Sequence, residues 1–587
     1  MSRLMAAASE DARSPAPSAA GAGDAVAAQA VVAAQAAVEI YDTTLRDGTQ
    51  GEGVNLSCSD KVAIAQRLDA LGVHFIEGGF PGSNPKDEEF FARVRDLDWQ
   101  HATVCAFGAT RRASLRASDD PGLTRLLAAG TRVCTLFGKS WTLHVEDVLC
   151  ISLEENLRLI EDSVARLCSE GRQVIYDAEH FFDGYRADPV YALATLQAAV
   201  QGGAQTVVLC DTNGGSLPWD VESVVRAVCA ALVEVRVGVH THDDGGVAVA
   251  NALSAVRAGA GQVQGTINGL GERCGNANLC TVIPDLSLKL GRPCLPTGKL
   301  KELSQVARYV AEVANLPLTG QAPYVGRSAF AHKGGVHVAA MRRHAGSYQH
   351  IDPEQVGNQS RVLVSDLSGR GNVLSLAEQL QMRASPEQAA GLVQQIKDSE
   401  AQGFAFEAAE ASVAMMMHRS QAGHAPLFVV RDYQTTVGRR PGCTMFCEGT
   451  IKVDIDGATE HTAADGNGPV SALAGALRKA LAPVWPAVAD IALCDYKVRI
   501  LEASAGTEAR IRVLITLRHG ARQWRTVGAS TNIIEASLIA LVDGLEYGLL
   551  FVVPQSKPDV ARPEGKAPSA AAPSATPAAD EAPAKGG

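Results

Sequence analysis

The sequence lacks several patterns that would assign it to a particular class of protein. None of its apolar runs approaches the roughly 18 residues that a membrane-spanning helix needs, so no membrane association is expected. The 13 cysteines include no CxxC pair and lie mostly in apolar runs, which predicts small core residues in a reducing cytoplasm. No basic stripe stands out and the formal net charge is −11, so nucleic acid is not an expected partner.

Both ends of the chain have biased compositions. Residues 1–37 are rich in Ala, Ser, Gly and Pro, lack the apolar core of a secretory signal and carry Glu10, Asp11 and Asp24. An export signal is therefore not expected, although an organelle transit peptide stays open. Residues 554–587 are rich in Pro and Ala. We expect both ends to be disordered tails of a cytoplasmic protein.

From residue 38 to 298, apolar strand-like runs alternate with helix-like segments. Eight such units over about 250 residues favour a TIM barrel, and the nearly continuous apolar runs suit parallel strands covered on both faces. A doubly wound open sheet is the alternative, but no GxGxxG motif follows the first strand. The predicted strands are Val38–Leu45, Phe75–Phe80, Ala102–Thr110, Arg132–Lys139, Gln173–Phe181, Thr206–Asn213, Val235–His242 and Val263–Leu270.

Two further regions follow the barrel. Residues 299–424 predict helical linker subdomains, interrupted by a polar, loop-rich segment at Tyr324–Asp352. Residues 425–553 show strands followed by a helix, twice, which predicts a small α+β domain. The two helices of this repeat are expected to open at Gly466–Val470 and Ser530–Ile533.

Polar side chains gather where the predicted barrel strands end. In a barrel those ends share one rim, so residues far apart in sequence meet there. The first strand ends with Arg46 and Asp47, and the seventh carries His240 and His242. Because residues i and i+2 of a strand point to the same face, the two imidazoles can bind one metal ion. A structural role for the pair is the alternative.

The carboxylate of Asp47 would complete a site with open coordination positions, as Lewis-acid chemistry requires. This mixed set of ligands suits Zn²⁺, Mn²⁺ or Fe²⁺, and Mg²⁺ remains possible. Asn276, in the glycine-rich segment after the eighth strand, offers a further oxygen. Arg46 beside the metal would bind a carboxylate or stabilise a developing oxyanion. The alternatives are a turn role for Asp47 and a strand-end salt bridge for Arg46.

Two other assignments near the rim are less specific. At the end of the fifth strand, Asp177, Glu179, His180 and Asp183 compete for the role of general base. Strand alternation places Asp177 and Glu179 on one face of the strand but does not indicate which of the two is the base. After the seventh strand, Asp244 is the expected N-cap of the next helix.

In this order, the motifs resemble the acyl-CoA-condensing synthases, namely the 2-isopropylmalate, homocitrate and citramalate synthases. The segments that carry the resemblance are LRDGTQGEG, DTNGGSLP, HTHDDGG, NGLGERCGNANL, HKGGVH and the final repeat, over about residues 38–553. The segments FIEGGFPGSNPKDEEFF, DAEHFFDGY and YQHIDPEQVGN look most like the citramalate branch. The resemblance implies condensation of acetyl-CoA with pyruvate to give (R)-citramalate and CoA on a route to isoleucine. The alternative is a 2-isopropylmalate synthase, which uses 2-ketoisovalerate in leucine biosynthesis.

The resemblance also implies roles for single residues. The implied ligands of a divalent Mn²⁺, Mg²⁺ or Zn²⁺ ion are Asp47, His240, His242 and Asn276. The implied catalytic residues are Arg46, Glu179, His337 and Tyr348, the last two reaching the active site of the other subunit of a homodimer. Thr212, with Arg46, would bind the keto acid. The final repeat would form a regulatory domain that senses isoleucine, with the two helix N-termini at 466–469 and 530–532 available to its carboxylate.

Two departures from the family pattern bear on these roles. Many relatives carry an acidic residue two positions after the histidine of HKGGVH, where this chain has Ala339, and their Glu-Asp pair on the fifth strand reads Glu179-His180 here. Two rival functions are a metal-dependent acyl-CoA lyase on the same barrel and a barrel retained only for binding. Lyases of that kind usually end soon after the barrel, whereas this chain continues, and the intact rim residues argue against a binding protein.

Overall fold

The computed structural model describes residues 37–553 except 381, 422 and 440–444. The predicted tails at 1–37 and 554–587 thus lie, apart from Ala37, outside the described residues. The chain divides into two compact units. One comprises Met1–His332 with His337–Val362, and the other comprises Lys333–Val336 with Leu363–Gly587.

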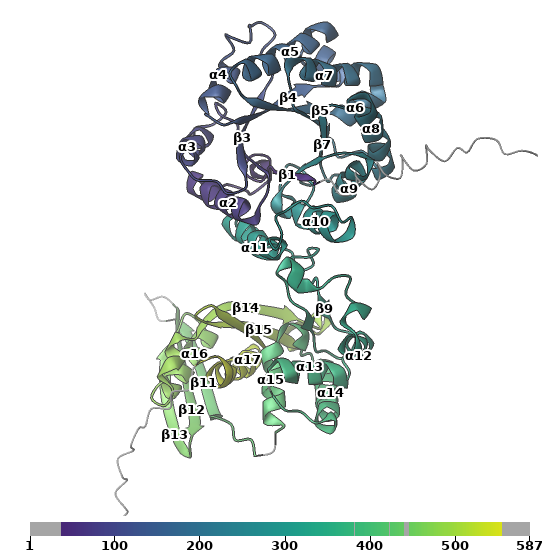
Figure 1. The fold of residues 1–587 in the computed structure, drawn as a ribbon. Coiled ribbons are helices and arrows are strands. Elements are labelled where there is room, and N and C mark those ends of the chain that lie inside the picture. The colour runs from purple at the N-terminus through teal and green to yellow at the C-terminus, as the bar shows by residue number, and fades with distance from the viewer. Residues whose placement is uncertain (1–36, 381, 422, 440–444, 554–587) are drawn as a thin grey trace, which may run out of the picture. The chain divides into compact units, whose positions relative to one another are not determined.

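The first unit contains a closed barrel of eight parallel strands in sequence order, which confirms the predicted TIM barrel. Figure 1 looks along this barrel and shows its helices outside the ring of strands. The strands are β1 (Glu39–Asp42), β2 (Phe75–Gly79), β3 (Thr103–Ala109), β4 (Val133–Lys139), β5 (Gln173–Glu179), β6 (Thr206–Asp211), β7 (Arg236–Thr241) and β8 (Gln262–Gly265). The last strand ends earlier than predicted because Asn268 adopts a left-handed conformation with φ 62°.

Helices connect the strands, and several begin at side chains that cap them. Ser57, Asn84 and Ser152 each accept a hydrogen bond from an amide of the first turn, as short polar side chains do at the N-cap. The helices of the barrel are α2 (Cys58–Leu71), α3 (Pro85–Val94), α4 (Pro121–Ala128), α5 (Leu153–Ser169), α6 (Phe181–Ala187), α7 (Pro189–Gly202), α8 (Pro218–Ala231), α9 (Ala248–Ala258) and α10 (Leu279–Pro284).

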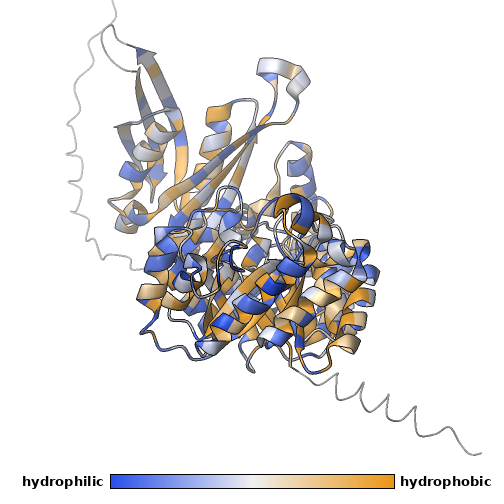
Figure 2. Ribbon diagram, turned by 90° about the horizontal axis from the view of Figure 1, so that it is seen from above, coloured by the Kyte–Doolittle hydropathy of each residue, from blue (hydrophilic) through white to orange (hydrophobic). Residues whose placement is uncertain are grey.

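Strand alternation divides the barrel side chains into two sets. On β6, Val207 and Leu209 belong to the large core between strands and helices, whereas Val208 and Cys210 belong to a small cluster inside the barrel. In Figure 2 the barrel strands are largely orange, and the surrounding helices mix orange and blue residues. The barrel interior therefore contains a small apolar cluster, and inward positions nearer the carboxyl ends of the strands can carry polar side chains.

The segment after the barrel contains α11 (Leu303–Val313), β9 (Ala331–His332), α12 (Gly335–Arg343) and β10 (Arg361–Val362). Helix α12 lies in the segment predicted to be loop-rich, so that prediction was wrong for nine residues. The glycines and polar residues of this segment hide the helical pattern, and only Val338 of the helix is buried. The predicted linker helices are present as α11, α13 (Arg370–Gln379) and α14 (Pro386–Ala401).

The second unit contains the predicted repeat. Two three-stranded antiparallel sheets, ordered β11-β12-β13 and β14-β15-β16, are each followed by a helix. The remaining elements of this unit are α15 (Glu410–Arg419), β11 (Val429–Arg439), β12 (Met445–Ile455), β13 (Ala458–Asp465), α16 (Pro469–Leu481), β14 (Ala492–Ile500), β15 (Ile511–His519), β16 (Arg522–Ser530) and α17 (Ile533–Tyr547). Both sheets and both helices contribute to one core, which includes Ile451, Leu477, Ile515 and Leu541.

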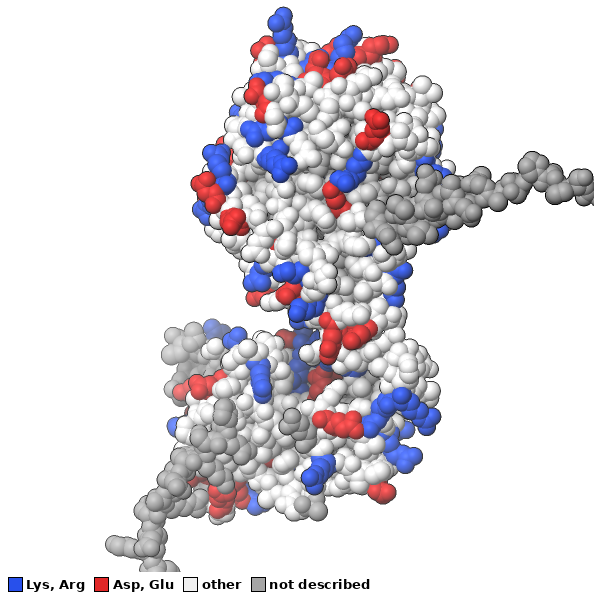
Figure 3. Space-filling view, viewed as in Figure 1, with Lys and Arg blue, Asp and Glu red and all other residues white. Residues whose placement is uncertain are grey.

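Charged residues, apolar helices and cysteines can also be located on the described part of the chain. On the face drawn in Figure 3, positive and negative side chains are interspersed rather than gathered by sign. Within the described part of the chain, no helix combines the length and the apolar character needed to cross a bilayer. The cysteines that the structure describes are free thiols, and most are buried or partly buried.

Candidate active site

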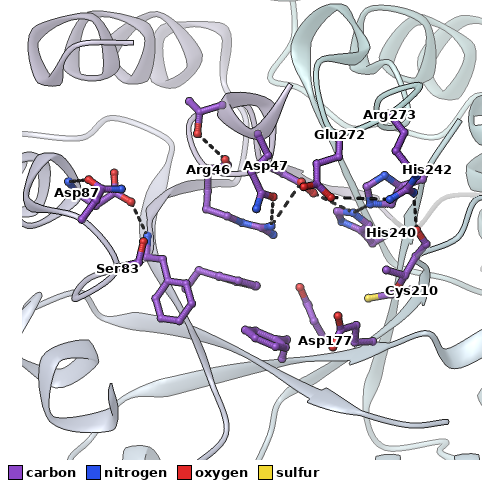
Figure 4. Close-up of a pocket in the computed structure, with 18 residues that line it drawn as sticks. Arg46, Asp47, Ser83, Asp87, Asp177, Cys210, His240, His242, Glu272 and Arg273 are labelled. Carbon is purple, nitrogen blue, oxygen red and sulfur yellow. Dashed lines mark hydrogen bonds and ion pairs between the residues drawn. The ribbon is translucent and has the colours of Figure 1, made fainter. Parts of the chain in front are cut away.

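Three side chains from opposite ends of the barrel sequence meet at its rim (Figure 4). Asp47 follows β1, His240 lies in β7 and His242 follows it, and all three are buried. Asp47 Oδ2 lies 3.2 Å from His240 Nε2, and the two histidine Nε2 atoms are 3.4 Å apart. One ligand atom from each residue lies within 4.8 Å of the others, so the three can hold a single metal ion.

A tight turn after β1 delivers Asp47 to this position. The Thr43 carbonyl accepts hydrogen bonds from the amides of Arg46, Asp47 and Gly48, at 3.1, 2.9 and 3.1 Å. The buried Asp42 carboxylate accepts from the Thr44 amide at 2.9 Å. The backbone of the first motif is therefore fixed before any ligand binds.

Asn276 lies beside the histidines through a backbone bridge to His242. Its Nδ2 donates to the Leu270 carbonyl at 3.0 Å, while its Oδ1 is buried and has no hydrogen-bond partner among the described residues. A buried acceptor without a partner is costly, so an unpaired oxygen on the residue bridged to His242 fits a further metal ligand. The loop needs glycine at Gly275, where φ is 90° and a Cβ would lie 1.9 Å from the Gly269 carbonyl oxygen.

Arg46 is held next to the triad by three contacts. Its NH1 lies 3.5 Å from Asp47 Oδ1, its Nε donates to Glu77 Oε1 at 2.5 Å, and its guanidinium lies 3.8 Å from the centre of the Phe107 ring. Glu77 is fully buried and also accepts from the Tyr41 hydroxyl at 2.7 Å. The guanidinium is thus oriented in advance, as a group that stabilises developing charge must be.

These neighbours shift the ionisation of the triad. Burial would raise the pKa of Asp47, but Arg46 and then His240 outweigh it and hold that pKa well below its usual range. Burial, together with the neighbouring His240, lowers the pKa of His242 to about 4. Burial opposes the charged form of His240, yet its hydrogen bond with Asp47 raises its pKa overall. An anionic Asp47 and a neutral His242 are the forms that bind a metal.

The triad opens into a cavity of about 330 Å³, a volume suited to a small ligand. Phe80, Phe107 and Phe137 form one wall, with ring centres 5.2 to 6.4 Å apart. Glu179 and Thr212 also line the cavity. The mixture of an aromatic wall with a few converging polar groups suits a small molecule that has both an apolar part and an anionic part.

Two of the polar groups at the cavity have defined partners. The Glu179 carboxylate forms an ion pair with the Lys139 ammonium, and about a quarter of its side chain is exposed. The Thr212 hydroxyl oxygen accepts from the His180 amide at 2.8 Å, so its own hydrogen is available to an anionic ligand. His180 itself has φ 58°, in the left-handed region.

His337 and Tyr348 are not among the described residues that line this cavity. Both are exposed, and their rings stack with centres 4.1 Å apart. The predicted N-cap at Asp244 was wrong. The Asp243 carboxylate accepts from the Ala248 amide at 2.8 Å, whereas Asp244 pairs with Arg273 at 2.7 Å, because the turn at 243–246 directs the two carboxylates apart.

Three residues of the site received no role from the sequence: Glu77, Lys139 and Gln264. Lys139 ends β4 and Glu77 lies two residues before the end of β2, so a charged residue near the end of an apolar strand was a signal for both. Gln264 accepts from His240 Nδ1 at 2.9 Å. Its only signal was a polar residue at an inward position of the eighth strand.

Comparisons with known proteins agree with this geometry. Residues 37–310 match the family described as HMGL-like, residues 324–403 the homocitrate synthase post-HMGL domain-like family, and residues 407–549 the LeuA allosteric (dimerisation) domain. An (R)-citramalate synthase of Aquifex aeolicus is 49% identical, over 87% of this chain and 98% of its own length. The chain belongs to the (R)-citramalate synthase family. A family member from Synechocystis is 50% identical, over 87% of this chain and 96% of its own length.

A 2-isopropylmalate synthase of Methanocaldococcus jannaschii is 30% identical, over 86% of this chain and 94% of its own length. The family expected from the motifs is thus confirmed. The 2-isopropylmalate synthase considered as the alternative is a more distant relative.

Proposed function

We propose that the chain is an (R)-citramalate synthase, which condenses acetyl-CoA with pyruvate and water and releases CoA. The observation that carries the proposal is the convergence of Asp47, His240 and His242 beside the fixed guanidinium of Arg46. This convergence lies in a chain that is 49% identical to an (R)-citramalate synthase over 98% of that protein. We further propose that catalysis resides in residues 38–298 and that the reaction takes place in the cytoplasm.

Asp47, His240, His242 and the Asn276 Oδ1 would hold a divalent metal ion. Bound there, the ion would supply Lewis-acid polarisation of a keto acid. Two nitrogen and two oxygen donors suit Zn²⁺ or Mn²⁺, and Mg²⁺ is the third candidate. The buried, unpaired Asn276 Oδ1 is the feature of the fold that best supports a fourth ligand.

Two side chains would orient pyruvate and stabilise the charge that develops on it. The Thr212 hydroxyl donates to the substrate carboxylate, since its oxygen already accepts from the His180 amide. Arg46 stabilises the negative charge that grows on the keto oxygen as its carbon is attacked. The aromatic wall that includes Phe107 and Phe137 is left to contact the substrate methyl group.

The methyl group of acetyl-CoA must lose a proton before its carbon can attack. Glu179 lines the cavity of its own chain, whereas His337 would act from the partner subunit, and both remain candidates for the base. The methyl carbon then bonds to C2 of pyruvate, and the keto oxygen takes up a proton. Water cleaves the thioester, which gives citramalate and free CoA.

The second unit supports a homodimer with feedback inhibition by isoleucine, since residues 407–549 match the LeuA allosteric (dimerisation) domain. The N-cap of α16 is Gly468, which offers no side chain to the first turn, whereas the N-cap of α17, Asn532, caps that helix with its side chain. The first amides of α16 are therefore the better place for the isoleucine carboxylate.

A thiol assay tests the catalytic proposal. Release of CoA from acetyl-CoA is followed with pyruvate, 2-ketoisovalerate and 2-ketoglutarate, each with and without a chelator. Pyruvate should accelerate release most, and the chelator should abolish the acceleration. No acceleration by pyruvate would overturn the assignment to citramalate.

The regulatory proposal has its own test, in which isoleucine and isoleucinamide are titrated into the same assay. Isoleucine should inhibit and the amide, which lacks the carboxylate, should not. Equal inhibition by both would exclude the N-terminus of α16 as the carboxylate site.

A further inference from the structure

A hydrogen-bonded chain crosses the barrel interior beneath the metal ligands. Gln264 on β8 is the register partner of His240 on β7, so their side chains lie next to each other. The Gln264 Oε1 atom is 2.9 Å from His240 Nδ1, and its Nε2 donates to Asp177 Oδ1 at 3.0 Å. Asp177 is on β5, and the exposures of Gln264 and Asp177 are 0% and 3%.

The chemistry of these groups fixes the direction of each hydrogen bond. The Gln264 Nε2 can only donate and lies against Asp177 Oδ1, so the amide donates to that carboxyl group. Its Oε1 then faces His240 and accepts, which requires a hydrogen on His240 Nδ1. The other ring nitrogen, Nε2, faces Asp47 Oδ2 at 3.2 Å, so it is the nitrogen placed to bind a metal ion together with Asp47.

We infer that Asp177 and Gln264 are positioning residues that fix the tautomer and the ring orientation of His240 as a metal ligand. The inference rests on the proposed metal site and goes beyond it, since neither residue would touch the ion. A histidine ligand whose other ring nitrogen has a fixed hydrogen-bond partner binds metal more tightly, typically by a factor of about 10 to 100.

The alternative explanation is that Gln264 is only a buried polar residue with satisfied hydrogen bonds. The same strand offers the matched control for that explanation. Gln262 is two residues earlier, faces the same side, is equally buried, and donates to Glu39 Oε2 at 3.1 Å, but it pairs in register with Gly238 instead of a ligand. Gln262→Leu therefore removes a buried amide from the barrel interior and leaves His240 intact.

The experiment measures the affinity of the metal-free full-length protein for Mn²⁺ and Co²⁺, with the absorption spectrum of the Co²⁺ complex as a second readout. We expect Gln264→Leu to weaken binding by about 10 to 100 times, and Gln262→Leu to leave it within about threefold of the wild type. Thermal melts identify variants that fail to fold.

A double variant provides a rescue that a purely structural role does not predict. In Asp177→Asn with Gln264→Glu, the amide introduced at position 177 donates to the carboxylate introduced at position 264, which still accepts from His240 Nδ1. This pair should bind metal within about threefold of the wild type or more tightly. Equal affinities for the two leucine variants, or a folded double variant without recovery, would overturn the inference while the proposed function stands. A wild-type chain that binds neither ion would overturn both.

Discussion

Replacement of Arg46 by alanine should have two effects that can be measured separately. The first is on stability, because the variant leaves Glu77 fully buried, with the Tyr41 hydroxyl as its remaining side-chain donor among the described residues. Removal of one member of a buried ion pair costs about 3 to 5 kcal/mol. Since the Arg46 side chain is 14% exposed, we expect the lower end of this range, about 3 kcal/mol in the unfolding of the barrel.

The second effect is on catalysis. Loss of one preorganised donor at a developing oxyanion costs a factor of about 10² to 10³ in turnover, equal to about 2.7 to 4 kcal/mol of transition-state stabilisation. The two effects separate in the double variant Arg46→Ala with Glu77→Gln, which removes the orphaned charge. It should regain most of the lost stability in urea unfolding, whereas CoA release should stay as slow as in the single variant.

Two results would refute this reasoning. Normal turnover in Arg46→Ala would remove the guanidinium from the mechanism. Recovered turnover in the double variant would show that Arg46 acts only through the fold. Arg46→Lys is the matched control, because it keeps a positive charge near Glu77 but lacks the planar fork of donors.

Four other predictions follow from the site. Thr212→Ala should raise KM for pyruvate about tenfold through loss of one hydrogen bond to a charged group, and Thr212→Ser should restore the wild-type KM. If steady-state kinetics show an unchanged KM for Thr212→Ala, Thr212 does not bind the substrate carboxylate. If Glu179 is the base, Glu179→Gln should lower kcat by about 10² to 10⁴ at unchanged pyruvate KM, whereas a near-normal kcat would point to His337. Asp47→Asn should weaken Mn²⁺ binding to the metal-free protein, as measured by calorimetry, and wild-type affinity would exclude Asp47 as a ligand. Burial raises the pKa of Asp42 to about 7, above its unfolded value near 4, so its contribution to stability is full below about pH 4 and is lost as pH rises through 7. Asp42→Asn should therefore gain unfolding free energy relative to the wild type between about pH 4 and 7, and parallel pH profiles would contradict this.

Much of the fold was predictable because its signals are local. The barrel strands are short apolar runs, and each of the eight was predicted near its observed position. The meeting of Asp47 with His240 and His242 followed from a single rule, that parallel barrel strands bring their carboxyl ends to one rim. The repeat in the second unit followed from the change from strand to helix periodicity.

What could not be predicted depends on contacts between strands. The hydrogen bond between Gln264 and His240 depends on the register between β7 and β8, which the sequence of either strand alone does not give. The hydrogen bond from Gln264 to Asp177 crosses the barrel interior. The wrong cap at Asp244 has a similar cause, because the turn and the partner Arg273 decide where each carboxylate points. The pairing of Lys139 with Glu179 joins ends of neighbouring strands that are 40 residues apart in the chain.

The measurement that tests the central claim most directly is a crystal structure of the Mn²⁺-loaded protein with anomalous scattering recorded from the metal. The account predicts one strong peak at the barrel rim, about 2.0 to 2.3 Å from an Asp47 oxygen and from one nitrogen each of His240 and His242. A peak located elsewhere, or a rim without one at saturating Mn²⁺, would contradict it.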